Sequence, residues 1–85
     1  YSGWNVPGVR GGRQEDLKLH LCCLDRDTGK MLWTRDVKPA LPEQDRIRDG
    51  HGYASSTPVA DGKRVFAFFG KSGVHAFDHD GKFLW

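Results

Sequence analysis

Apolar and polar residues alternate with a period of two over several short stretches of this chain. This alternation is typical of β-strands, whose successive side chains point to opposite faces of a sheet. It predicts strands over residues 18–25, 31–37, 53–60, 64–69, 74–78 and 82–85. The stretches between them are rich in Gly, Asp and Pro, the residues that turns require. The pattern therefore predicts an all-β fold.

Two of the predicted strands are apolar on both faces. In residues 18–25, one face carries Leu19, Leu21 and Cys23, and the other carries His20, Cys22 and Leu24. Residues 64–69 are also apolar on both sides. A strand of this kind is covered by a layer on each face. We therefore expect these strands to lie in sheets that stack on neighbouring sheets.

The stretch 21–33 recurs as 74–85. Each copy has an apolar strand, a turn containing Asp and Gly, and a second strand that ends on Trp33 or Trp85. These tryptophans are 52 residues apart, whereas Asp25 and Asp78 are 53 apart because the second copy lacks a counterpart of Thr28. A supersecondary unit that recurs at about 20–50 residues indicates a solenoid or a propeller.

The chemistry of the two turns follows from their residues. We expect Asp25 and Asp78 to accept hydrogen bonds from backbone N–H groups, and Gly29 to supply a positive φ. The first turn is predicted to be bulged and Asp80–Gly81 to be a two-residue turn, so that both tryptophans reach equivalent faces.

The residues Asp25, Thr28, Gly29 and Trp33 form a pattern that resembles the tryptophan-docking motif of PQQ-like β-propeller repeats. The run 55–65 resembles the opening strand and hairpin of a blade in that family. The resemblance covers roughly residues 18–85, interrupted by 38–52. It implies a fragment of a β-propeller. Residues 1–37 would be a long loop and two closing strands of one blade, 38–52 an inter-blade connection with six charged residues, and 53–85 a complete four-stranded antiparallel blade.

The same resemblance carries two expectations about function. The family includes an outer-membrane assembly lipoprotein and quinoprotein dehydrogenases. We expect a non-catalytic scaffold for protein or ligand binding, with neighbouring blades and other proteins as partners, located in the periplasm or cell envelope. The alternative is part of a quinoprotein dehydrogenase that uses PQQ and calcium. The tryptophans are expected to anchor one blade on the next.

Charge and hydropathy narrow the classes of partner. The 13 Lys and Arg residues and 11 Asp and Glu residues are interspersed, and the net charge is +2. A basic stripe that would neutralise phosphates is missing from this pattern, so we expect no nucleic-acid partner. No apolar run reaches the roughly 18–20 residues needed to cross a bilayer, which predicts no transmembrane segment.

The adjacent pair Cys22–Cys23 is the sharpest candidate for redox chemistry. The resemblance implies this possibility, because some quinoprotein dehydrogenases carry a disulfide between adjacent cysteines at the cofactor site. Neighbouring residues on a strand point to opposite faces, however, and bridging them would distort the strand. The second copy has His75 and Ala76 at these positions. We therefore predict that the cysteines are packing positions.

Other candidate motifs are better explained by structure than by chemistry. The four histidines lack metal-ligand spacing, Asp25 and Asp78 occupy equivalent turn positions, Ser55–Ser56 lacks a Gly-x-Ser-x-Gly elbow, and the glycine-rich run 8–13 lacks a phosphate-loop ending. The histidines are His20, His51, His75 and His79. The sequence therefore predicts no catalytic, cofactor-binding or metal-binding residue.

Overall fold

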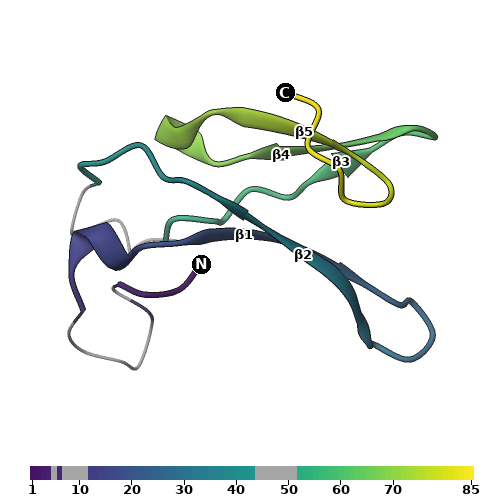
Figure 1. The fold of residues 1–85 in the computed structure, drawn as a ribbon, viewed down its shortest axis with the longest axis horizontal. Coiled ribbons are helices and arrows are strands. Elements are labelled where there is room, and N and C mark those ends of the chain that lie inside the picture. The colour runs from purple at the N-terminus through teal and green to yellow at the C-terminus, as the bar shows by residue number, and fades with distance from the viewer. Residues whose placement is uncertain (5, 7–11, 44–51) are drawn as a thin grey trace.

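The computed structural model describes residues 1–4, 6, 12–43 and 52–85 and arranges them in two antiparallel sheets (Figure 1). The elements in chain order are η1 (Gln14–Asp16), β1 (Leu19–Leu24), β2 (Met31–Val37), β3 (Val59–Ala60), β4 (Arg64–Phe68), η2 (Gly70–Ser72) and β5 (Val74–Asp78). One sheet has the order β1-β2 and the other β3-β4-β5. The all-β prediction is confirmed. Among these residues, neither 3₁₀ helix approaches the length and hydropathy that a bilayer-spanning helix needs.

A hydrophobic core joins the two sheets. Its buried members come from the N-terminal segment, β1, β2, residue 53, and β4 to β5: Trp4, Leu17, Leu19, Leu21, Val37, Tyr53, Ala67, Phe69 and Phe77. Phe77 and Leu19 are the largest side chains that are almost wholly buried. Because alternate residues of β1 and β5 point to the same side, each strand contributes one face to this core.

The opposite face of the β3-β4-β5 sheet carries several exposed apolar side chains, although Ala76 on this face is buried. It carries Val59, Phe68, Val74 and Trp85, whose exposed fractions are 66%, 51%, 49% and 58%. The prediction that β4 is apolar on both faces is therefore confirmed. On β1, the outward-facing Cys22 and Leu24 are also exposed. Both sheets thus leave one face uncovered in the described part of the chain.

The predicted four-stranded unit over residues 53–85 is only partly formed. Its first strand is limited to Val59–Ala60, because Pro58 has no N–H to donate to a ladder. Its last strand is reduced to an isolated bridge between Phe77 and Phe83, with further backbone hydrogen bonds from Ala76. The described residues therefore form a three-stranded sheet with a short bridged edge, and the expected complete four-stranded blade is not confirmed.

The sequence repeat is also a structural repeat. In β1–β2, Cys23 pairs with Trp33 and Leu24 with Met31, so Leu32 is an extra, bulged residue. In the second copy, the Ala76 carbonyl accepts hydrogen bonds from Leu84 N (2.8 Å) and Trp85 N (3.4 Å). A bulge thus precedes the tryptophan in both hairpins and sets its direction.

Aspartate side chains organise the three tight turns. Asp25 Oδ1 accepts hydrogen bonds from the N–H groups of Asp27 and Thr28, and Asp78 Oδ1 from those of Asp80 and Lys82. Asp61 Oδ1 does the same for the N–H groups of Lys63 and Arg64. The predicted role of Asp25 and Asp78 as turn caps is confirmed.

The glycine of each repeated turn has a positive φ. Gly29 has the predicted geometry with φ 75°, and Gly81 has φ 87°. The second turn is one residue longer than predicted, because Asp78 N–H donates to the Lys82 carbonyl around residues 79–81. The first turn closes in the same way, because Asp25 N–H donates to the Lys30 carbonyl. Its extra residue therefore lies within the loop.

The predicted N-terminal loop contains more structure than expected. Ser2 and Lys18 exchange backbone hydrogen bonds at 2.9 Å in both directions, and Trp4 bridges Gly12. The segment therefore runs beside β1. Residues 8–11 of the glycine-rich run and residues 44–51 of the expected connection, His51 among them, lie outside the described residues.

Turn capping predicts a specific dependence of stability on pH. The backbone N–H groups of Thr28 and Asp27 hold the pKa of the Asp25 carboxyl below its ordinary value, and those of Lys63 and Arg64 lower the pKa of Asp61. A pKa that is lower in the folded state means that this stabilisation is complete above the unfolded pKa of about 3.9 and is lost as the pH falls through the folded pKa. Carboxyl-carbon NMR titration should place both groups below about 3.9. Asp61→Asn should remove part of the loss of stability in acid. Ordinary pKa values for both groups would contradict this.

Candidate functional site

The most developed contact between the two sheets is made by Trp33. Its side chain leaves β2 and covers the turn at residues 79–81, where its Nε1 donates a hydrogen bond to the His79 carbonyl at 3.1 Å. A Cβ built on Gly81 would lie 2.8 Å from Trp33 Cδ2, closer than carbon atoms approach without bonding. Gly81 is buried. The indole therefore rests directly on the backbone of the following hairpin, as predicted for an anchoring tryptophan.

Arg35 completes this contact from the same face of β2. Its Nε donates to the Gly81 carbonyl at 2.6 Å, and its Nη2 lies 3.4 Å from the Asp80 carbonyl. The guanidinium carbon is 5.4 Å from the centroid of the Trp33 ring, within the range of a cation–π interaction. Two side chains thus bind three consecutive backbone carbonyls, those of residues 79–81.

A second arrangement joins Ser2, His20 and Asp36. Ser2 Oγ is 2.8 Å from His20 Nε2, and His20 Nδ1 is 2.8 Å from Asp36 Oδ1. His20 and Asp36 are cross-strand partners in β1–β2, and Ser2 is aligned by its pairing with Lys18. The order of groups is that of a serine-hydrolase triad.

Two features assign this arrangement a structural role. The side chain of Asp36 is 61% exposed, whereas the aspartate of a working triad is buried. The Ser2 N–H donates to the Lys18 carbonyl, so it is not free to stabilise an oxyanion. The three side chains therefore act as a clamp that ties the N-terminal segment to β1 and β2.

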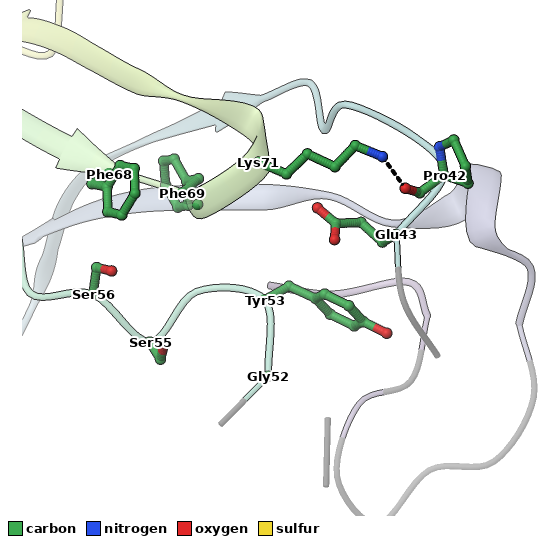
Figure 2. Close-up of a pocket in the computed structure, with 10 residues that line it drawn as sticks. Pro42, Glu43, Gly52, Tyr53, Ser55, Ser56, Phe68, Phe69 and Lys71 are labelled. Carbon is green, nitrogen blue, oxygen red and sulfur yellow. Dashed lines mark hydrogen bonds between the residues drawn. The ribbon is translucent and has the colours of Figure 1, made fainter. Parts of the chain in front are cut away.

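One pocket lies beside η2 and has a volume of about 350 Å³ (Figure 2). It is lined by residues from three segments: Pro42, Glu43, Gly52, Tyr53, Ser55, Ser56, Phe68, Phe69, Gly70 and Lys71. Lys71 Nζ donates a hydrogen bond to the Pro42 carbonyl and closes one side of the pocket. Phe68 and Phe69 form an aromatic wall above the segment that carries Ser56 (Figure 2).

The chemistry of this pocket fits binding better than catalysis. Among the described residues that line it, Glu43 supplies a carboxylate and Lys71 an ammonium group. Those described residues include neither a histidine nor a second carboxylate to serve as an acid–base partner. An aromatic wall with a few polar groups is suited to hold a small molecule or a side chain.

The remaining candidates from the sequence lie apart from one another. His75 Nε2 lies 2.9 Å from the Ser72 carbonyl, and His79 Nε2 lies 2.8 Å from the Asp61 carbonyl. Within residues 1–4, 6, 12–43 and 52–85, no three His, Cys, Asp or Glu side chains converge as metal ligands. Cys22 and Cys23 are free thiols on consecutive positions of β1, and Cys22 Sγ lies 3.6 Å from Thr34 Oγ1. Cys22 is exposed and Cys23 half-buried, so their role as packing positions stays a prediction.

Two residues that make these contacts, Arg35 and Ser2, are not among the candidates that the sequence predicts. Arg35 lies two residues after Trp33 and therefore on the same face of the strand, a signal that the period of two contains. Ser2 had no such signal, because its approach to His20 depends on the path of the N-terminal segment. Comparison with protein-family models, curated proteins and solved structures gives no match to this chain.

Removing the docked indole should destabilise the protein. Trp33→Ala deletes a partly buried aromatic and its hydrogen bond, so we expect a loss of about 3 kcal/mol in the free energy of unfolding, at the lower end for aromatic truncation. Chemical denaturation measures this loss. Trp85→Ala, studied at a concentration where the chain is monomeric, is the matched control because Trp85 is 58% exposed. Equal losses for the two variants would show that docking on residues 79–81 contributes nothing.

Proposed function

We propose that this chain is part of a PQQ-like β-propeller that acts as a non-catalytic scaffold for binding other proteins or ligands. The observation that carries the proposal is the docking of Trp33 on residues 79–81 of the next hairpin. Sheets stacked face to face through a recurrent side chain are what a propeller requires of its blades. The repeat of turn, bulge and tryptophan supports the same conclusion, since it provides the means of adding further units.

The exposed face of β3-β4-β5 supports the proposal from a second direction. Single exposed apolar side chains are common, but a contiguous apolar face marks a surface that another element covers. A following blade would cover it, just as the present second sheet covers the core face of β1–β2. The scaffold would act in the periplasm or cell envelope, as the family resemblance suggests. Its pocket beside η2 offers one place for a ligand.

Tandem copies test this proposal. One or two further copies of residues 34–85 fused after Trp85 should raise the melting temperature with each addition, because each unit covers the apolar face of the one before. Each 1 kcal/mol gained at an interface corresponds to roughly 4–8 °C in a domain of this size. In the control array, Ala replaces Trp85 and its equivalents, and the increase should be largely lost. A melting temperature that does not change with copy number contradicts the proposal.

The alternative, part of a PQQ-dependent dehydrogenase, makes a different prediction for Cys22 and Cys23. If these cysteines are packing positions, replacing both with Ala should cost about 1 kcal/mol of stability and change no redox behaviour. We expect no alcohol- or sugar-dependent dye reduction by either protein supplied with PQQ and calcium. Turnover by the unchanged protein that disappears in the double variant would favour the dehydrogenase.

A further inference from the structure

The chain contains a second copy of the turn that accepts Trp33. Residues 25–30 repeat the Asp cap, the positive-φ glycine and the following lysine of residues 78–82. Gly81 is buried beneath an indole, whereas Gly29 is exposed and a Cβ built on it would meet nothing within 4 Å. Within the described ranges, the carbonyls of residues 26–29 accept no hydrogen bond. This turn is therefore an open acceptor.

The apolar residues beside the open turn are uncovered as well. Leu24 and Met31 are 55% and 49% exposed, although Phe77, which corresponds to Leu24 in the repeat, is only 2% exposed. The difference arises because the first hairpin lies on the core face of the second, while no described segment covers Leu24 and Met31 on the outer face of the first. The open turn thus has an apolar margin that a partner would cover.

The chain also contains a second copy of the tryptophan donor. Trp85 follows a bulge, as Trp33 does, and stands opposite Ala76, the counterpart of Cys23. It shares its row of the sheet with Phe66, at a ring separation of 6.0 Å, and is 58% exposed. Alternation of side chains directs Trp85 away from β1–β2, because Ala67 and Phe77 occupy the face toward them.

The open donor and the open acceptor lie on opposite outer sides of the two-sheet stack, so they cannot meet within one copy. We propose that Trp85 of one copy docks on residues 25–30 of a second copy, in the manner of Trp33 on residues 79–81. The partner is argued from this self-complementarity: one molecule holds both halves of a contact that it already makes once. The inference rests on the stacking mode of the proposed scaffold.

The proposed contact is head-to-tail, because it joins different surfaces of the two copies. It can therefore form only certain kinds of assembly. A heterologous contact closes into a ring when the rotation between copies permits and otherwise forms an open filament.

Sedimentation velocity on two blocking variants and their mixture tests this inference. Gly29→Asn keeps a residue that tolerates positive φ but places a Cβ where the indole would rest. Trp85→Ala removes the donor. We expect the unchanged chain to associate, each variant alone to associate at least about tenfold more weakly, and their equimolar mixture to form a one-to-one dimer that grows no further.

Gly73→Asn is the matched control, because Gly73 also has a positive φ, 86°, and a Cβ built on it would meet nothing within 4 Å, yet it belongs to neither repeated turn. It should associate like the unchanged chain.

The inference is wrong if either blocking variant associates like the unchanged chain, or if the mixture remains monomeric. If the mixture is monomeric while fused copies still gain stability, only this inference fails. The open turn would then accept a tryptophan from a neighbouring repeat of the same chain. If fusion also brings no gain, the scaffold proposal fails with it.

Discussion

The contact between the Trp33 indole and the backbone at Gly81 is the constraint on which the rest of the structure depends. It requires a glycine, because any Cβ at position 81 would overlap the ring. It requires a turn whose carbonyls point outward, since Trp33 and Arg35 bind those carbonyls. It also requires the bulge at Leu32, because a shift of one residue would send the indole to the other face.

These requirements explain why the two sheets stack as they do. Antiparallel sheets with apolar faces attract one another without selecting a direction, because burial of apolar area is not directional. The hydrogen bonds from Trp33 and Arg35 fix how far and at what angle the first hairpin lies on the second. The aspartate caps keep the accepting turn rigid, so little conformational entropy is lost when the indole docks. In this interface the packed core attracts the two sheets to each other, and the contacts of Trp33 and Arg35 fix their orientation.

Local rules predicted much of this structure, and long-range contacts account for the rest. The period of two located β1, β2, β4 and β5, and the Asp–Gly pattern identified the capped turns. The strand expected over residues 53–60 is limited to Val59–Ala60, because Pro58 has no N–H to donate to a ladder. Likewise, the link from Ser2 through His20 to Asp36 depends on how the N-terminal segment returns beside β1. The spacing of residues in the sequence does not indicate this link.

Nuclear Overhauser and hydrogen-exchange NMR tests the central contact most directly. At a concentration where the chain is monomeric, the account predicts cross-peaks between the Trp33 ring and the Gly81 α-protons, which should be shifted by the ring current. The Trp33 indole N–H, which donates to the His79 carbonyl, should exchange more slowly than the exposed indole N–H of Trp85. Equal exchange for the two indoles, with no Trp33–Gly81 cross-peak, would contradict it.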